Sequence, residues 1–309
     1  MNERTRPEVV WEERPLRSLL FAPGNHPRKL EKVGGFGSDA IVLDLEDAVA
    51  DAEKTAARET VRAALPTYRA PTIVFVRVNG PETGRLEDDV RATVCSDLDG
   101  LMIPKVEDPA TLPELDRLLS GIEGERGLPE GHVRLIALIE TARGLIRCED
   151  IALSAPPRLL TIVFGLGDFS VDIGVDLTPD ATELLYGRSR VVVAARAARL
   201  RPALDGPWLD LQNIDGLVAD TLRSRQLGFQ GRVVVYPPQV EHVLRTYSEL
   251  SPEEAERAER VVEAFEQAEA GGSASIQVDG RFVDYPIYAR AKEKLRLYRA
   301  LRDGAGSRA

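Results

Sequence analysis

The chain has 309 residues, of which 43% are hydrophobic, 29% charged and 6% aromatic, a composition typical of a globular protein. Its 50 acidic and 40 basic residues give a formal charge of −10, which disfavours nucleic acid and anionic membrane surfaces as partners. Two cysteines are too few for a disulfide framework, no run reaches the roughly 18 apolar residues of a membrane span, and residues 1–14 form a polar leader without an apolar signal core, so we expect a cytoplasmic protein.

Short apolar runs rich in β-branched residues recur along the chain, and a longer amphipathic stretch follows each. They lie at 17–23, 40–46, 72–79, 100–106, 133–140, 159–165, 203–211 and 232–237. Such runs are typical of buried parallel strands, and the stretches between them, such as 51–64, are typical of helices with one apolar face. Eight strand–helix repeats predict an α/β protein that closes into a (β/α)8 TIM barrel rather than an open doubly wound sheet.

The strand–helix rhythm stops after the eighth run. A helix is predicted from an N-cap at Ser251 to the Gly271-Gly272 pair. A hairpin around an Asp279-Gly280 turn follows, and Pro286 opens a terminal helix. We therefore assign 1–244 to the barrel with its polar leader and 245–309 to a small helical and hairpin lid at the C-terminus.

Polar residues end the predicted strands, and the carboxyl ends of the strands form the active-site face of such a barrel. They are Asp44, Glu46 and Asp47 after the second run, Arg77 and Asn79 after the third, Lys105 after the fourth, Glu140 after the fifth and Asp168 after the sixth. Converging carboxylates suit a hard cation such as Mg²⁺, which takes oxygen ligands and keeps water. Zinc is disfavoured because His26, His132 and His242 are scattered and lack a metal-ligand spacing.

Some of these residues also have a purely structural interpretation. Glu140 could cap a helix or form a salt bridge with Arg143. Lys105 could pair with Glu107 or Asp108, which lie close to it in the sequence. These alternatives stay open from the residue pattern alone.

Several blocks of the sequence, taken in order, carry a resemblance to a known family. They are RSLLFAPGNHPRKLEK (17–32), DAIVLDLEDAV (39–49), VRVNG (76–80), LMIPKVE (101–107), LIALIETARGL (135–145), FGLGDFSVDIG (164–174), YGRSRVVVAARAA (186–198), LGFQGRVVVYPPQ (227–239) and GRFVDYPIYARAKE (280–293). Through these blocks nearly the whole chain resembles the citrate lyase β-subunit-like branch of the HpcH/HpaI aldolase superfamily, which includes malyl-CoA and citramalyl-CoA lyases.

The resemblance implies a (β/α)8 barrel with a C-terminal lid, assembled as a homo-oligomer, either a trimer or a hexamer. It implies Mg²⁺, with Mn²⁺ as the alternative ion, held by Glu140 and Asp168. Asp44 and Glu46 match acids that orient metal-bound waters in the family. Arg77 matches the arginine that contacts the reacting oxygen atoms.

The resemblance also implies a site for the CoA thioester. The matching positions are Phe21, Arg28, Lys32, Val235 and Tyr236, among which the two cations suit the phosphates of CoA. Tyr236 stands where many relatives have histidine, and this departure leaves the substrate open. Arg28 and Lys32 could instead belong to a solvated helix face around Glu31.

Asp284 matches the lid acid that, in family members, reaches into the site of a neighbouring subunit. It stands just before the helix that Pro286 opens, so Asp284 could instead be a capping residue. In the catalytic interpretation it exchanges the proton of the acetyl-CoA methyl group, while Arg77 stabilises charge on oxygen.

The implied activity is that of a Mg²⁺-dependent carbon–carbon lyase acting on a short β-hydroxyacyl-CoA such as malyl-CoA or citramalyl-CoA. The products would be acetyl-CoA and a 2-oxo acid, and the reverse condensation uses the same chemistry. Two enzymatic alternatives are a malyl-CoA thioesterase or malate-synthase-like outcome and a citrate lyase β subunit acting on an acyl-carrier thioester. A non-catalytic acyl-CoA-binding subunit is a further alternative, and it would not need Glu140 and Asp168 together.

Overall fold

The computed structural model describes residues 11, 14–248 and 252–305. The chain divides into two compact units, the first ending at Tyr247 and the second beginning at Ser248. The first unit extends past 244, where the sequence interpretation ends the barrel, because Leu244 and Tyr247 pack against the barrel core. Apart from Trp11 and Arg14, the predicted polar leader lies outside the described residues, as does the predicted N-cap Ser251.

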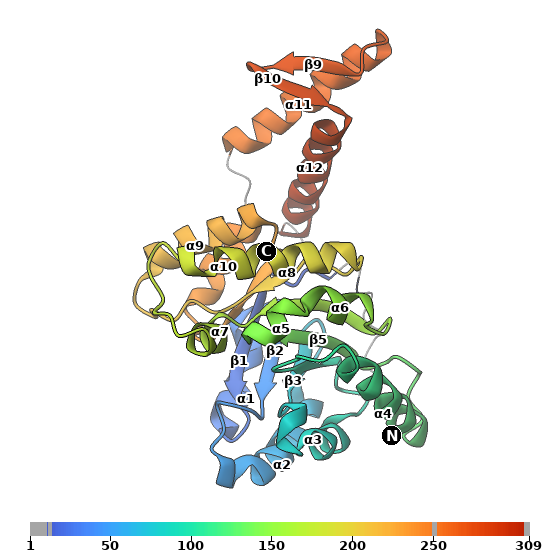
Figure 1. Ribbon diagram of the computed structural model, residues 1–309, viewed down its shortest axis with the longest axis vertical. Coiled ribbons are helices and arrows are strands. Elements are labelled where there is room, and N and C mark those ends of the chain that lie inside the picture. The colour runs from blue at the N-terminus through green and yellow to red at the C-terminus, as the bar shows by residue number, and fades with distance from the viewer. Residues whose placement is uncertain (1–10, 12–13, 249–251, 306–309) are drawn as a thin grey trace. The chain divides into compact units, whose positions relative to one another are not determined.

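Eight parallel strands close into a barrel in the order in which they occur in the sequence (Figure 1). They are β1 (Ser18–Pro23), β2 (Ala40–Asp44), β3 (Ile73–Arg77), β4 (Gly100–Ile103), β5 (Arg134–Ile139), β6 (Leu159–Phe164), β7 (Leu204–Asp205) and β8 (Gly231–Val234). The strands are almost entirely apolar because one face lines the barrel interior and the other packs against helices. The predicted (β/α)8 barrel is therefore confirmed.

Helices follow the strands and surround the barrel (Figure 1). They are α1 (Pro27–Val33), α2 (Lys54–Ala64), α3 (Leu86–Thr93), α4 (Thr111–Glu125), α5 (Ala142–Ile146), α6 (Cys148–Leu153), α7 (Leu166–Asp172), α8 (Leu185–Ala197), α9 (Ile214–Leu227) and α10 (Gln239–Ser248). Single 3₁₀ turns occur at Gly34–Phe36, Asp51–Glu53, Leu65–Thr67, Pro81–Thr83 and Thr182–Leu184. Among the described residues, no helix combines the length and apolar character needed to cross a membrane.

Two apolar clusters hold the barrel together. One fills its interior with side chains from alternate strand positions, including Val42, Phe75, Met102 and Val163. The other lies between the outer faces of the strands and the helices. Because the interior is packed with side chains, a site for small molecules must lie at an end of the barrel rather than within it.

The seventh strand is much shorter than predicted. The apolar run at 203–211 contributes only Leu204–Asp205 to the sheet. Pro207 cannot donate a hydrogen bond to a neighbouring strand, and beyond it Leu209 and Leu211 are exposed. The prediction of a strand in this place was correct, but its length was wrong.

The second unit contains two helices and a hairpin. They are α11 (Pro252–Ala270), β9 (Ser275–Val278), β10 (Arg281–Asp284) and α12 (Tyr285–Ala305). The turn residues Asp279 and Gly280 both have positive φ, 47° and 74°, as a tight two-residue hairpin requires. Phe265 and Val283 are the most buried members of a small separate core between the helices and the hairpin.

Candidate active site

Six charged side chains gather at the carboxyl ends of strands β2 to β6. We call them the mouth cluster: Asp44, Glu46, Arg77, Lys105, Glu140 and Asp168. Asp44 and Arg77 are the last residues of β2 and β3 and are partners in the strand register. Glu140 follows β5 directly, and Asp168 lies in the first turn of α7. The strand ends thus bring together residues that are far apart in the sequence, as the sequence analysis expects.

Asp44 holds the guanidinium group of Arg77 in a two-pronged ion pair. Its Oδ1 accepts from Arg77 Nε at 2.7 Å and its Oδ2 accepts from Nη2 at 2.6 Å. The same carboxylate accepts from the main-chain N–H groups of Glu46, at 2.9 Å, and Ala48, at 3.2 Å. A carboxylate has about four acceptor positions, and these four bonds occupy them. Asp44 therefore orients Arg77, and its implied role toward metal-bound water stays a prediction.

Glu46 is a buried carboxylate placed between two cations. Its Oε2 lies 2.8 Å from Arg77 Nη1, and its Oε1 accepts from Lys105 Nζ at 2.6 Å. Burial raises the pKa of Glu46, and the charges of Arg77 and Lys105 oppose this rise. For both cations burial favours the neutral form, but the acids around them outweigh this effect and raise the pKa of each. Both cations therefore remain protonated.

The local partners that sequence proximity suggested for Lys105 are wrong. Glu107 lies 3.8 Å from Arg143, and Asp108 lies 3.1 Å from Arg147. Lys105 instead pairs with Glu46 and, at 3.3 Å, with the more exposed Asp47. The lysine is thereby part of the mouth cluster.

Glu140 is the most perturbed carboxyl group of the cluster. It is 2% exposed, and burial, followed by the negative charge of Glu46, raises its pKa to about 8. The charge of Asp168 raises the pKa further, while Arg77 and a hydrogen bond from the main-chain N–H of Lys105, 2.8 Å long, lower it. Helix α5 is capped by Thr141 rather than by Glu140. The structural alternatives for Glu140, a helix cap or an Arg143 partner, are therefore not what the structure shows.

Gly165, between β6 and α7, makes room for the Glu140 carboxylate. A Cβ atom placed on this glycine would lie 2.5 Å from Glu140 Oε2 and closer still to the Glu140 Cβ. Any side chain at position 165 would therefore displace the Glu140 side chain or the backbone around it. The contact between Gly165 and Glu140 was not predicted from the sequence; a glycine directly after a strand, beside a strand-end acid, was the available signal.

The mouth cluster fits a divalent cation. When all six groups are ionised, the four carboxylates and two cations leave a formal net charge of −2. A buried carboxyl group with a pKa of about 8 gains most from a nearby cation. No group of three or more His, Cys, Asp or Glu side chains in the described residues is arranged to hold a metal ion. Glu140 and Asp168 remain the predicted protein ligands, and a pair of carboxylates suits Mg²⁺, which keeps water in its remaining positions.

The residues proposed to bind CoA are distributed over two strand ends and one helix. Phe21, on β1, contacts the cluster directly, since the Arg77 guanidinium lies 5.1 Å from the centre of its ring. Arg28 and Lys32 are exposed on α1, and no hydrogen bond or ion pair joins the side chain of either to another described residue. Val235 is exposed and Tyr236 half-buried in the turn after β8. The structure thus places Phe21 against the mouth cluster and leaves the side chains of Arg28 and Lys32 available to a ligand.

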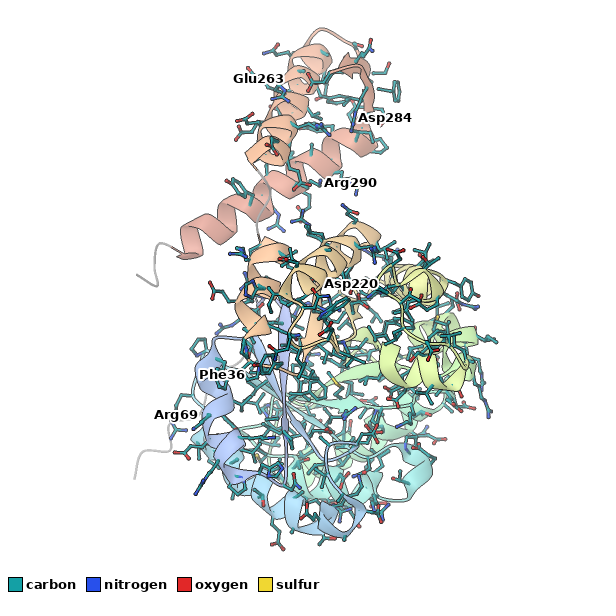
Figure 2. All side chains as sticks on the ribbon, turned by 90° about the vertical axis from the view of Figure 1, so that its left-hand side faces the viewer. Phe36, Arg69, Asp220, Glu263, Asp284 and Arg290 are labelled. Atoms are coloured by element: carbon teal, nitrogen blue, oxygen red, sulfur yellow. The ribbon has the colours of Figure 1, made fainter. Side chains whose placement is uncertain are left out.

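Asp284 is the last residue of β10 and belongs to the second unit (Figure 2). Its Oδ1 accepts a hydrogen bond from the main-chain N–H of Ile287 at 3.3 Å, at the start of α12. The capping contact considered in the sequence analysis is therefore present. It occupies one oxygen of the carboxylate and does not exclude a second role.

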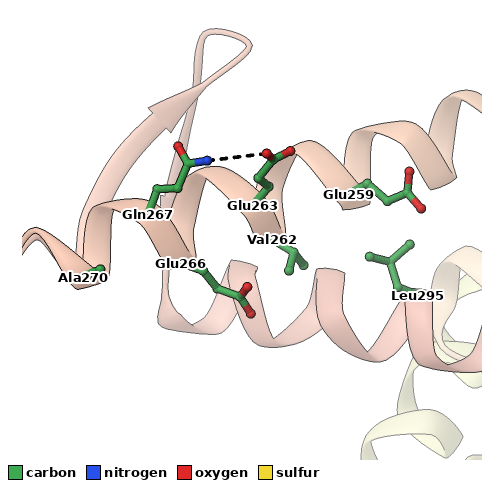
Figure 3. Close-up of a pocket in the computed structure, with 7 residues that line it drawn as sticks. All are labelled: Glu259, Val262, Glu263, Glu266, Gln267, Ala270 and Leu295. Atoms are coloured by element: carbon green, nitrogen blue, oxygen red, sulfur yellow. Dashed lines mark hydrogen bonds between the residues drawn. The ribbon is translucent and has the colours of Figure 1, made fainter.

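The second unit also contains a cavity of about 610 Å³ (Figure 3). It is lined by Glu259, Val262, Glu263, Glu266, Gln267, Ala270 and Leu295. Glu266 accepts hydrogen bonds from Tyr288 and Lys292, while Glu263 accepts from Gln267 (Figure 3). A cavity lined by three glutamates repels the phosphates of a CoA ester, and we therefore do not place the substrate there.

A lysine that the sequence analysis did not single out supports the segment carrying Glu46. Lys54 Nζ donates to the carbonyl oxygens of Leu45, at 3.1 Å, and Glu46, at 3.0 Å, and to Asn79 Oδ1 at 2.6 Å. Asn79 in turn donates to Leu45 O and to Asp89. Helical periodicity places Lys54 on a polar face, and nothing in that pattern indicates a contact with a strand end.

A closed (β/α)8 barrel with a charged site at the carboxyl ends of its strands defines an enzyme-type TIM barrel. The model of the HpcH/HpaI aldolase/citrate lyase family matches residues 17–237, which include all six members of the mouth cluster. The chain therefore belongs to the HpcH/HpaI aldolase/citrate lyase family, and the resemblance seen in the sequence is confirmed.

Similar proteins cover nearly the full chain. It is 37% identical over 290 residues to citrate lyase subunit beta of Leuconostoc mesenteroides subsp. cremoris, covering 93% of this chain and 95% of that protein. It is 35% identical over 288 residues to a (3S)-malyl-CoA thioesterase of Cereibacter sphaeroides, covering 93% and 96%. Relatives with two different activities thus have similar identity to this chain.

Solved structures agree with this assignment. CitE from Mycobacterium tuberculosis, in complex with magnesium, acetoacetate and coenzyme A, has a TM-score of 0.75 and 26% identity, covering 93% of this chain and 99% of that chain. RipC from Yersinia pestis has a TM-score of 0.63 and 31% identity, covering 77% and 97%.

Proposed function

We propose that this protein is a Mg²⁺-dependent carbon–carbon lyase that cleaves a short β-hydroxyacyl-CoA, such as malyl-CoA or citramalyl-CoA, into acetyl-CoA and a 2-oxo acid, or condenses the two. The observation that carries the proposal is the mouth cluster, in which a buried Glu140 with a pKa of about 8 lies beside Asp168 and Arg77. The relatives add that magnesium and coenzyme A bind together in the CitE structure from Mycobacterium tuberculosis.

In this proposal Glu140 and Asp168 hold the metal ion. The ion would supply a Lewis acid that polarises oxygen atoms of the 2-oxo acid portion. Lys105 N–H donates to Glu140 Oε1 at 2.8 Å, and Oε2 is the oxygen that we propose faces the ion. Asp168 accepts no hydrogen bond from the described residues, so its carboxylate is available to a ligand.

Arg77 stabilises the charge that develops on oxygen as the carbon–carbon bond breaks. Two of its five N–H donors bind Asp44 and one faces Glu46, which leaves two for the substrate. Because Asp44 orients the guanidinium before the substrate arrives, little reorganisation is needed during the reaction.

Thioester binding falls to residues around β1 and β8. Arg28 and Lys32 attract the phosphates of CoA as exposed cations on α1. Phe21, Val235 and Tyr236 contribute apolar and aromatic surface near the acyl portion. Tyr236 would then distinguish substrates, since a phenol and an imidazole differ in size and in hydrogen bonding.

Asp284 completes the reaction as the group that exchanges the proton of the acetyl-CoA methyl carbon. We propose that the homo-oligomer, a trimer or a hexamer, presents Asp284 of one subunit to the mouth cluster of a neighbour. A lid residue can exclude water during the reaction and then move away to release a CoA-sized product.

The decisive experiment offers purified protein a panel of malyl-CoA, methylmalyl-CoA and citramalyl-CoA with Mg²⁺ and follows the products by mass spectrometry. Acetyl-CoA or propionyl-CoA together with a 2-oxo acid would support the lyase. A free hydroxy acid with free CoA would make the protein a thioesterase, like the Cereibacter sphaeroides relative. If no thioester reacts, the same panel attached to an acyl-carrier protein tests a citrate lyase β activity, and no product in either series would contradict the proposal.

Subunit sharing has its own test. Asp284→Asn and Glu140→Gln proteins, each inactive alone, are mixed under conditions that allow subunit exchange. Part of the activity should return, because some sites then contain both intact groups. If native mass spectrometry finds mixed oligomers and no activity returns, Asp284 does not act across an interface.

A further inference from the structure

Lys105 has a backbone conformation that is unfavourable for its residue type. Its φ is 48°, in the left-handed region that glycine adopts readily and other residues rarely adopt. Such a conformation persists only when surrounding contacts enforce it. Besides its contact with Asp47, this one residue makes two contacts within the mouth cluster: its main-chain N–H donates to Glu140 Oε1, and its ammonium group donates to Glu46 Oε1.

The side-chain contact controls how Glu46 meets Arg77. With Oε1 bound to Lys105, Glu46 approaches the guanidinium only through Oε2. Without the ammonium group, a buried carboxylate that has lost one cation would turn both oxygens toward the remaining one. Glu46 would then compete with the substrate for the free N–H donors of Arg77.

The main-chain contact controls which oxygen of Glu140 is available. Glu140 Oε1 is bound by Lys105 N–H, whereas Oε2 lies on the Gly165 side, toward the segment that carries Asp168. If the backbone at 105 left its φ of 48°, this N–H would point elsewhere and the Glu140 carboxylate could rotate.

We propose that Lys105 is a positioning residue with two separable effects: its ammonium group keeps Arg77 available to the substrate through Glu46, and its left-handed backbone orients Glu140 for the metal ion. This inference rests on the proposed function and deepens it. The residue touches neither the bond that breaks nor the metal ion; it acts through two residues that do.

The side-chain effect is tested with Lys105→Met, which removes the charge and keeps an unbranched side chain. Turnover should fall by roughly 10- to 100-fold, as for other residues that orient catalytic groups, while the KM of the thioester and the Mg²⁺ dissociation constant stay within about threefold. Lys105→Arg should recover most of the turnover. In the double variant Lys105→Met/Glu46→Gln, turnover should fall by less than the product of the two single-variant fold-losses, because the two residues act through one contact.

The backbone effect is tested with Lys105→Val, because a β-branched side chain resists positive φ. Its Mg²⁺ dissociation constant, measured by calorimetry without substrate, should rise by roughly tenfold relative to Lys105→Met. Arg199→Val is the matched control, since Arg199 is exposed in the turn after α8 with a φ of 56°, and its replacement should leave Mg²⁺ affinity unchanged.

Crystal structures of the wild type and Lys105→Met separate a failure of this inference from a failure of the proposed function. The variant should show both oxygens of Glu46 on Arg77, whether or not the wild type cleaves any thioester. An unmoved Glu46 would overturn the side-chain effect, and unchanged Mg²⁺ affinity in a folded Lys105→Val protein would overturn the backbone effect. If Lys105→Val does not fold, the Mg²⁺ titration is repeated with Lys105→Thr, whose β-branched side chain also resists a positive φ.

Discussion

The barrel contains two groups of buried charges that differ in how completely they are balanced. One is the mouth cluster. The other, which we call the buried quartet, consists of Arg188 on α8, Asp205 on β7, Asp220 on α9 and Arg232 on β8, all at most 2% exposed. The quartet has two positive and two negative charges, whereas the mouth cluster has an excess of carboxylates.

The contacts of the quartet are nearly closed on themselves. Arg188 binds Asp220 with two bonds of 2.9 Å and also contacts Asp205 at 3.0 Å. Arg232 donates to Asp220 at 3.0 Å and to Gly206 O and Thr221. Burial opposes ionisation of Asp220, but Arg188 and Arg232 outweigh it and lower its pKa.

The mouth cluster shows the opposite shift. There burial, together with the negative charges of Glu46 and Asp168, raises the pKa of Glu140 to about 8, and the opposing charge of Arg77, which Asp44 already engages, does not outweigh them. Removing one member of a balanced buried network destabilises the fold, whereas a buried network with an excess of carboxylates is a candidate site for a cation. The comparison therefore separates a structural from a functional set of charges within one barrel.

The largest effect we expect concerns stability. Arg188→Met removes the arginine that contacts Asp205 and leaves Asp220 with Arg232 and, at 3.5 Å, Arg223, so it should lower the free energy of unfolding of the barrel by about 3–5 kcal/mol. Arg190→Met, on the same helix but in a half-exposed pair with Glu149, should cost about 1 kcal/mol or less. Urea unfolding followed by circular dichroism measures both. Equal losses for the two variants would remove the distinction between quartet and surface pair.

For the mouth cluster we expect loss of function without loss of fold. Glu140→Gln should weaken Mg²⁺ binding and lower turnover by about 100-fold or more, because replacing residues that only support metal ligands already costs 10- to 100-fold. Glu107→Gln, at the same end of the barrel, is the control. Calorimetric Mg²⁺ titration and turnover are the measurements, and wild-type values for Glu140→Gln would sink the metal site.

Arg77→Lys sharpens the distinction between binding and catalysis. Lysine keeps the charge but loses the planar fork that Asp44 holds, so turnover should fall roughly 100-fold, as when one donor to a developing oxyanion is lost. Steady-state kinetics at saturating Mg²⁺ measures this. A change confined to KM would make Arg77 a residue that binds substrate and transition state equally.

The smallest effect is a pH dependence that belongs to Glu140. Its pKa is about 8 in the folded protein against 4.5 in the unfolded chain. Between these values the folded state keeps a proton that the unfolded state has lost, so without Mg²⁺ this group lowers stability as pH rises, by at most about 1.4 kcal/mol per pH unit. Urea unfolding in EDTA at pH 6 and pH 7 should show this slope in the wild type and a reduced one in Glu140→Gln. Identical slopes would contradict the shift.

Mg²⁺ should reverse that dependence. Binding displaces the proton of Glu140, so Mg²⁺ affinity should increase with pH up to about 8 and level off above it. Calorimetry in buffers of different ionisation enthalpy would count the released proton. Affinity that does not change between pH 6 and pH 8 would show that Glu140 is already ionised without the metal.

Local patterns predicted most of the barrel. Seven of the strands follow apolar runs whose residues are buried on both faces, and such runs are visible in the sequence without knowledge of their neighbours. The 203–211 run misled because its apolar residues include Leu209 and Leu211, which are exposed. Pro207 was the available sign that the strand ends early.

The candidate site was predicted in its members but not in its contacts. Strand ends converge by geometry, so Asp44, Arg77 and Glu140 could be grouped from their positions alone. The partner of Lys105 could not, because Glu46 lies 59 residues away and local acids offered a simpler interpretation. The left-handed backbone at position 105 could not be predicted either, because the residue there is lysine rather than the glycine that usually marks a positive φ.

The short β7 strand has a consequence for how the barrel opens. A single register pair joins β6 to β7 and two join β7 to β8, against five between β1 and β2. Main-chain hydrogen bonds are therefore fewest between β6, β7 and β8. Side-chain hydrogen bonds replace some of them there: Thr161, for example, donates to the carbonyl oxygens of Arg201 and Pro202. Amide hydrogens of β6 and β8 should consequently exchange with solvent faster along this seam than those of β2 and β3, through local opening that leaves the rest of the cylinder closed.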